Sequence, residues 1–293
     1  MKSKILMFGL VLTLMTIGCS KDKDADSTRT NFTAEEAGIN AKIDFLNDDV
    51  NKISEEQLNV ADGISGKIAT PTAFFLPACA TVTRVPAIGT IPSVGSTVVK
   101  TIDFGTTGCP MPNGNILRGK IILSFLYEPT ATTHVINCTF DNFYHNLRKI
   151  EGTKTFTRTM TTVTPASPSH PIWIMNMNLV IILPDGRILN RVGTRTSEII
   201  AGYSTPLDWT DNEYSVTGNW TTTYPNTSYL TSSITSPLII KFACVPTNSA
   251  ISQGIISYVR NSQTATLDYG NGSCDNQAIF IINGISYPIT LGN

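Results

Sequence analysis

Residues 265–291 read ATLDYGNGSCDNQAIFIINGISYPITL, and this stretch decides the fold class. Its apolar and β-branched runs are short, and turn dipeptides separate them at Asn271-Gly272 and Asn283-Gly284. An Asn-Gly pair between such runs favours a tight hairpin, because both turn residues need positive φ. Residues 279–282 and 285–291 are therefore predicted to pair as antiparallel strands.

The same pattern continues toward the N-terminus, as far as about residue 70. Short connections without intervening helices favour an antiparallel sheet. We therefore predict a mainly β domain over residues 70–293, either an antiparallel β-sandwich or a large rolled antiparallel sheet. A proline-rich loop at 161–171 is the candidate boundary between two halves, 70–160 and 172–293. The predicted strands are 94–104, 119–126, 134–144, 150–160, 172–183, 187–196, 214–224, 228–235, 237–245, 254–259, 264–269, 277–282 and 285–291.

One helical segment, 33–62, precedes the strands. Thr33 and Glu36 have the spacing of a capping box, and a second such pair, Ser54 and Gln57, predicts a break near Ile53. The apolar stripe lasts only two heptads, so packing on the β domain is favoured over a coiled coil. We expect the side chains of Asp48 and Asp49 to be exposed to solvent. The stripe consists of Ile39, Ile43, Leu46, Val50, Ile53 and Gln57.

Cys19 indicates where the protein is placed. A basic start, an apolar run over 5–17 and Gly18 are typical of a secretory signal peptide over residues 1–18. The segment 16–19 resembles the lipobox of bacterial lipoproteins, in which the cysteine is acylated, although Thr16 stands where leucine is usual. We expect Cys19 to attach the chain to a membrane, with an ordinary signal peptide as the alternative.

Residues 19–32 are polar and charged, and we expect them to form a flexible tether. The charged run 20–24 resembles that of surface-exported lipoproteins, so we expect the cell envelope, at the outer membrane and facing outward. Loss of Lys2 and Lys4 with the signal peptide would change the formal net charge from −1 to −3. Such a chain lacks the basic face that nucleic acid requires.

Two segments repeat one pattern. Residues 103–109 read DFGTTGC and residues 268–274 read DYGNGSC. The terminal cysteine of each lies thirty residues after another cysteine, which predicts the disulfides Cys79–Cys109 and Cys244–Cys274 and indicates a duplicated unit. Cys138 is then a buried free thiol. Asp103 and Asp268 are expected to bond to turn backbone, in preference to binding calcium.

No catalytic motif stands out. The histidines His134, His145 and His170 match no zinc pattern, and neither an HExxH nor a GxSxG sequence occurs. We therefore assign no catalytic residue, metal or cofactor. The loop 205–213 combines Trp209 with Asp208 and Asp211, which suits stacking on a sugar. An ordinary loop with a partly buried tryptophan is the alternative.

Three stretches carry a family resemblance: 265–291, FDNFYHNLRKIEGTKT at 140–155, and SVTGNW at 215–220. Together they resemble a family of uncharacterised lipoproteins from Bacteroidota. The resemblance implies export, lipidation and a β-rich fold, and it implies no catalytic residue. We expect a structural or binding protein of the cell envelope with glycan or protein partners, and the alternative is a hydrolase acting on an envelope or extracellular polymer.

Overall fold

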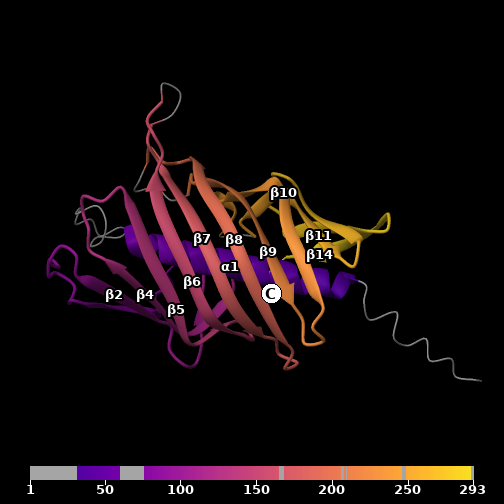
Figure 1. Cartoon of the computed structure of the whole chain (residues 1–293), viewed down its shortest axis with the longest axis horizontal. Coiled ribbons are helices and arrows are strands. Elements are labelled where there is room, and N and C mark those ends of the chain that lie inside the picture. The colour runs from indigo at the N-terminus through magenta and orange to yellow at the C-terminus, as the bar shows by residue number, and fades with distance from the viewer. Residues whose placement is uncertain are drawn as a thin grey trace, which may run out of the picture. The chain divides into compact units, whose positions relative to one another are not determined.

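In the part of the chain that the structure describes, the fold consists of one antiparallel sheet and one long helix (Figure 1). The computed structural model describes residues 32–59, 76–164, 168–205, 208, 210–245 and 249–291. Strands pair in the order β1-β2-β4 and then consecutively to β14, while β3 pairs with β4. The predicted mainly β, antiparallel class with an N-terminal helix is confirmed. The elements are α1 (Ala34–Asn59), β1 (Thr81–Val85), β2 (Thr97–Asp103), β3 (Cys109–Pro110), β4 (Ile116–Leu126), β5 (Thr133–His145), β6 (Arg148–Met160), β7 (Pro171–Ile182), β8 (Ile188–Ala201), β9 (Glu213–Thr223), β10 (Tyr229–Lys241), η2 (Phe242–Cys244), β11 (Ile251–Arg260), β12 (Gln263–Asn271), β13 (Gln277–Ile282) and β14 (Ile285–Thr290).

The C-terminal hairpin forms as its sequence predicts. Ile282 of β13 pairs with Ile285 of β14. The two residues between them, Asn283 and Gly284, have φ of 51° and 76°. Both values are positive, as the tight turns of two-residue hairpins require.

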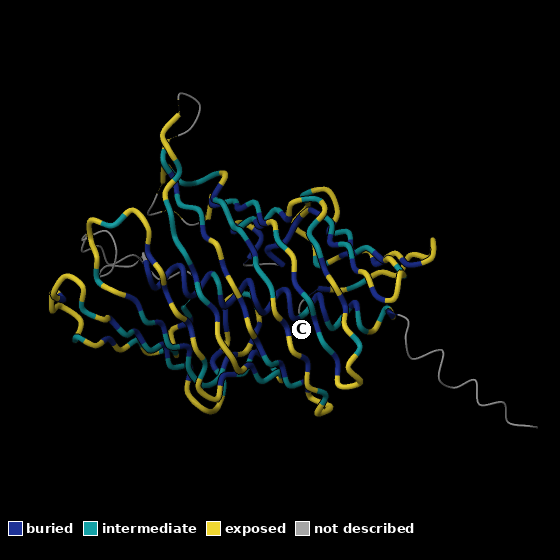
Figure 2. Tube along the Cα trace, in the orientation of Figure 1, coloured by how far each residue is buried: buried dark blue, intermediate teal, exposed yellow. Residues whose placement is uncertain are grey.

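Buried and exposed residues alternate along the strands, because successive side chains point to opposite faces of a sheet (Figure 2). On β7, Met175 and Met177 are buried while their neighbours Ile174 and Asn176 are exposed. The buried side chains form one core beneath the inner face of the sheet. The inward-facing apolar side chains of β7 and β9 are all buried: Trp173, Met175, Met177, Leu179, Ile181, Tyr214, Val216 and Trp220.

Glycines allow the sheet to bend at irregular positions. Gly119 lies where the pairing of β4 with β5 slips by one residue, and its φ is +77°. A Cβ atom there would collide with the carbonyl oxygen of Asn142. Gly254 lies at a similar slip in the pairing of β11 with β12, and a Cβ atom there would collide with the carbonyl oxygen of Pro237. Bulges of this kind bend a strand and increase its twist, which curves the sheet.

The helix begins at the predicted capping box. The backbone N–H of Glu36 donates to Thr33 Oγ1 at 3.2 Å, and that of Thr33 donates to Glu36 Oε2 at 3.1 Å. The predicted break near Ile53 is wrong, because α1 runs unbroken to Asn59. Ser54 caps nothing and instead donates its hydroxyl to the carbonyl of Val50. In the described part of the chain, no helix is both long enough and apolar enough to cross a membrane.

The sheet encloses α1. Every residue from position 43 to position 50 is buried, and eight consecutive positions cover all sides of a helix with 3.6 residues per turn. The predicted solvation of Asp48 and Asp49 is therefore wrong, since their exposures are 3% and 1%. Figure 1 shows α1 running across the strands rather than along them, so residues along its length meet different strands.

The loop at 161–171 does not divide the sheet. Strands β6 and β7 on its two sides pair from Lys149 with Ile182 to Met160 with Pro171. The backbone N–H of Thr161 also donates to the carbonyl of His170 at 2.9 Å. The predicted halves 70–160 and 172–293 therefore share one continuous sheet.

Most strand ends lie within a few residues of the prediction, and the strands themselves differ from it in two ways. Strands β1 and β3 are additional, and both are short. The predicted runs 228–235 and 237–245 join into the single strand β10, because Pro237 is accommodated where the pairing register shifts. Proline is tolerated in a strand at such irregular positions. The strand ends at Lys241, and the last predicted positions form the 3-10 helix η2 instead.

Candidate functional site

The interior between α1 and the sheet is charged, with opposite signs on the two elements. The helix carries seven acidic side chains against two basic ones, which gives it a net charge of −5. Five basic side chains on the inner face of the sheet are buried against α1 or beside it. They are Lys100, Lys154, Arg191, Arg195 and Arg260.

The centre of this interior is an ion-pair cluster between α1 and β8. Asp44 Oδ1 accepts from Arg191 Nη1 and from Arg195 Nη2, each at 2.6 Å. One helical turn on, Asp48 Oδ1 accepts from Arg195 Nη1 at 3.2 Å. Burial lowers the pKa of Arg195, but the charges of Asp44 and Asp48 outweigh burial and raise it.

An aromatic ring supports both guanidinium groups of this cluster. The guanidinium carbon of Arg195 lies 4.2 Å from the ring centroid of Trp220, and that of Arg191 lies 5.4 Å from it. The remaining donors of Arg191 reach Asn40 Oδ1 at 2.6 Å and Thr222 Oγ1 at 3.2 Å. Because the cations are held by several partners at once, the cluster fixes where α1 lies along β8 and β9.

Further along α1, Asp49 and His145 form a second buried pair. His145 Nε2 lies 2.8 Å from Asp49 Oδ2, and both side chains are 2% exposed. Asn115 and Asn113 donate to the same carboxylate. Burial by itself raises the pKa of Asp49, yet the hydrogen bond and charge of His145 leave that pKa below its ordinary value. The histidine is therefore held to the helix through its Nε2 atom.

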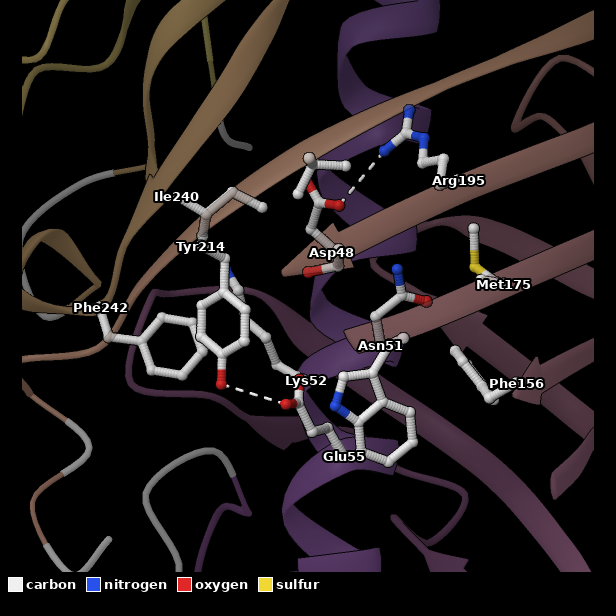
Figure 3. A pocket seen from close by; sticks show the side chains of 13 residues that line it. Asp48, Asn51, Lys52, Glu55, Phe156, Met175, Arg195, Tyr214, Ile240 and Phe242 are labelled. Carbon is white, nitrogen blue, oxygen red and sulfur yellow. Dashed lines mark hydrogen bonds and ion pairs between the residues drawn. The ribbon is translucent and has the colours of Figure 1, made fainter. Parts of the chain in front are cut away.

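A small cavity lies beside the ion-pair cluster (Figure 3). In Figure 3 the Tyr214 hydroxyl points at the carboxylate of Glu55, to which it donates at 3.1 Å. Burial raises the pKa of Glu55 to about 7 and lowers the pKa of Lys52. The cavity has a volume of about 40 Å³, which is room for about three water molecules. It is lined by Asp48, Asn51, Lys52, Glu55, Phe156, Trp173, Met175, Arg195, Ser197, Tyr214, Val216, Ile240 and Phe242.

Lys154 and Cys138 lie opposite one another on β6 and β5. The Lys154 ammonium donates to Asn51 Oδ1 at 3.0 Å, and burial lowers its pKa to about 7. Cys138 is buried and makes no disulfide, as predicted. Burial raises the pKa of its thiol to about 12. Because the thiolate is the nucleophile, a thiol with that pKa is inert at neutral pH.

Both predicted disulfides are confirmed. Cys79 is bonded to Cys109, and Cys244 is bonded to Cys274. The first bond closes the segment containing β1 and β2, and the second closes the segment containing β11 and β12. Each segment thus contains two paired strands followed by a turn, with a disulfide across it.

The two closing turns share one hydrogen bond. Asp103 Oδ1 accepts from the backbone N–H of Gly105 at 2.8 Å, and Asp268 Oδ1 accepts from that of Gly270 at 2.9 Å. The aspartates therefore shape turns, as expected. The two glycines have φ of 72° and 87°, a region that favours glycine.

The predicted sugar-binding loop is only partly described, because Trp209 lies outside the described residues. Asp208 Oδ1 accepts from the backbone N–H and the hydroxyl of Thr210, and these bonds lower its pKa. Asp211 Oδ2 accepts from Thr205 Oγ1 at 2.6 Å. Both carboxylates thus bond within their own loop, and its role in binding stays a prediction.

The histidines lie in separate surroundings. His145 is paired with Asp49, and His170 Nε2 lies 2.9 Å from Glu198 on β8. His134 is on β5, where burial lowers its pKa. Within the described ranges, no three or more His, Cys, Asp or Glu side chains gather in a way that could hold a metal ion.

Sequence reasoning missed the basic side chains of the inner face, although the sequence contains a signal for them. Arg191 and Arg195 share strand parity with Leu189 and Ile199, and all four are buried. A basic residue at a position that the alternation of the strand places on its apolar face is expected to be buried. Because the chain also contains an acidic helix, such a residue indicates an internal ion pair. No protein-family model, no curated protein and no solved structure matches the chain, so its resemblance to Bacteroidota lipoproteins stays a prediction.

Proposed function

We propose that this chain is an exported protein of the cell envelope, of structural or binding type, anchored in the outer membrane by a lipid on Cys19. Its signal-peptide pattern and lipobox support export and anchoring. The two disulfides fit an oxidising compartment outside the cytoplasm. The partner is a glycan or a protein at the cell surface.

The observation that carries a non-enzymatic role is the occupation of the interior by α1. Pockets that bind small molecules have volumes of about 300–1,000 Å³. The cavity beside Glu55 has about 40 Å³, since ion pairs and the helix fill the rest. A sugar ring does not fit such a space, so binding falls to the outer face and the loops.

A hydrolase is the second candidate, and one observation favours it. Glu55 has a pKa of about 7 and lies in one cavity with Asp48 and Lys52. A carboxyl group with such a pKa can act as an acid near neutral pH. Incubation with extracellular polymers, followed by an assay for released ends, distinguishes the candidates. We expect no release, and release that disappears with Glu55→Gln would make the hydrolase the better proposal.

Lipid attachment has a direct test. Cells expressing the chain are labelled with a palmitate analogue, and the wild type is compared with Cys19→Ala. We expect label only on the wild type, with the variant released from the membrane fraction. Equal labelling of both forms would remove the anchor from the proposal. Cys138→Ala is the matched control, because Cys138 is a buried thiol that no acyl transfer should reach.

Binding is tested with the Cys19→Ala chain on an array of glycans, with and without calcium. We expect at least one glycan to be retained without calcium. The same screen with Trp209→Ala tests the loop 205–213, because a lost signal would assign binding to that loop. Absence of any glycan signal, together with no protein captured by crosslinking at the cell surface, would contradict a binding role.

A further inference from the structure

The outer face of the central strands, β5 to β10, carries three neighbouring rows of uncharged side chains, which we name the neutral array. Residues within a row are register partners on adjacent strands, and none of them is buried. The middle row is Asn137, Thr155, Asn176, Thr194, Asn219 and Ser233; one flanking row is Thr139, Thr153, Asn178, Val192, Thr221 and Thr231; the other is Val135, Thr157, Ile174, Thr196 and Thr217.

Absence of charge over such an area is unusual for a protein surface. Soluble domains contain about 25% charged residues on average, and surfaces designed for solubility are given about 25–35%. Lys154, Arg191 and Arg195 of the same strands face inward. Glu151 and Glu198 are partly exposed, and both lie outside the three rows. The array is therefore polar without being ionic, which selects for uncharged ligands.

The array forms a regular grid of hydrogen-bonding groups. Adjacent strands lie about 4.8 Å apart, and alternate residues along a strand lie about 6.6–6.8 Å apart. In the middle row carboxamides alternate with hydroxyls as far as Asn219. Thr194 Oγ1 donates to Asn176 Oδ1 at 2.8 Å, and Thr155 Oγ1 donates to Asn137 Oδ1 at 3.3 Å. These bonds orient the carboxamides, and each keeps two N–H donors.

The composition of the array excludes most classes of partner. Nucleic acids and acidic glycans need cations, which the array lacks. A peptide strand adds to a sheet edge, whereas these central strands are paired on both sides. A protein partner prefers aromatic anchors, and the array has only the scattered aliphatic residues Val135, Ile174 and Val192. What remains is a long, uncharged ligand rich in hydroxyl groups.

We propose that the neutral array binds an extended, uncharged polysaccharide that lies across the strands along the middle row. This inference rests on the proposed binding role and names its ligand class. The strand spacing is close to the length of one sugar unit in an extended chain, so successive units meet successive strands. Each hydrogen bond contributes little, and binding arises from many weak contacts along the row.

The test removes hydrogen-bonding groups from the array without changing its shape. Thr194→Val/Asn219→Leu alters a register pair in the middle row. The matched control, Asn190→Leu/Thr223→Val, alters a register pair of the same two residue types on the same two strands, outside the array. All four side chains lie on the outer face, so both variants should melt close to the wild type. Circular dichroism checks this.

Binding is measured by affinity electrophoresis of the Cys19→Ala chain in native gels. The gels contain dextran, laminarin, glucomannan or xyloglucan as uncharged probes, and alginate as the charged probe. We expect at least one uncharged polymer to retard the chain and alginate to have no effect. The array variant should weaken that retardation at least tenfold, and the control variant should change it less than twofold.

Four outcomes would overturn the proposal: no retardation by any uncharged polymer, retardation by alginate alone, equal weakening in both variants, or a dimer in sedimentation that only the array variant dissociates. The last would assign the face to a second copy of the chain. Failure here is distinguishable from failure of the binding role. If the array variant still binds on the glycan array or at the cell surface, the binding role stands and only the array is excluded.

Discussion

The ion-pair cluster between α1 and β8 predicts a large loss of stability when Arg195 is replaced by Met. The change removes the donor to Asp44 at 2.6 Å and to Asp48 at 3.2 Å. Arg191 continues to pair with Asp44. Asp48 loses the only ion-pair partner within 4 Å that the structure records for it among the described residues.

The magnitude follows from burial. Arg195 and Asp48 are 2% and 3% exposed. Breaking a buried pair by removing one partner costs about 3–5 kcal/mol, because an uncompensated charge stays in the interior. Methionine fills much of the arginine volume, so cavity formation adds little. At about 2–4 °C per kcal/mol for a chain of this size, the melting temperature should fall by about 6–20 °C.

Arg187→Met is the matched control, since Arg187 also pairs with an acid of α1. Its partners Glu35 and Asp185 are 72% and 50% exposed, and Arg187 itself is 38% exposed. Exposed pairs contribute about 0–1 kcal/mol. Urea denaturation followed by circular dichroism, with the disulfides intact, gives both values. Arg195→Lys keeps one charge, and its stability should lie between those of the wild type and Arg195→Met.

Equal loss in Arg195→Met and Arg187→Met would refute the reasoning, because it would mean that the central cluster is solvated. The same conclusion would follow if about 1 M salt abolished the difference between them. Salt at that concentration shortens the Debye length to about 3 Å and screens exposed pairs, but it screens buried pairs much less.

Three further predictions concern the interior. The pKa of Glu55 is about 7 in the folded chain against 4.5 for a free carboxyl, so the unfolded chain loses this proton at lower pH than the folded chain does. The folded state therefore becomes less stable as pH rises. Between pH 4.5 and about 7.5, the free energy of unfolding of the wild type should fall by about 3 kcal/mol relative to that of Glu55→Gln in urea titrations. Cys244→Ser/Cys274→Ser should cost about 3–4 kcal/mol, and an unchanged urea midpoint would contradict it. Cys138 should react with a thiol reagent only after unfolding, so modification in native buffer would place it outside the core.

Local features of the fold were predictable from the sequence. The turn at Asn283-Gly284, the capping box at Thr33 and the disulfide of Cys79 depend on residues close in sequence or on repeated spacing. Hydrophobic alternation likewise identified most strands. These features follow from short-range stereochemistry, which the sequence states directly.

The charged interior was not predictable in the same way. Asp48 and Arg195 are separated by 147 residues in sequence. Charged residues are mostly exposed unless they are paired, so solvation was the default for an aspartate on a helix. The only signal was that Arg191 and Arg195 occupy the same alternate positions as the apolar residues of their strand, which indicates that they face the core. That signal does not identify their partners. The neutral array was missed for a related reason, because its rows depend on the pairing register of six strands.

The central strands thus place Arg191 and Arg195 inside and the neutral array outside, and this arrangement predicts how binding responds to salt. Buried pairs do not add stability over well-packed apolar residues, so the interior charges of Asp44 and Arg195 serve to fix the position of α1. They are too deeply buried to attract a ligand. Binding of an uncharged polysaccharide to the array should therefore change less than about twofold between about 0.1 M and about 1 M salt in affinity electrophoresis. A ligand held by ionic contacts would weaken by orders of magnitude over that range, and such a fall would show that charged groups outside the array carry the binding.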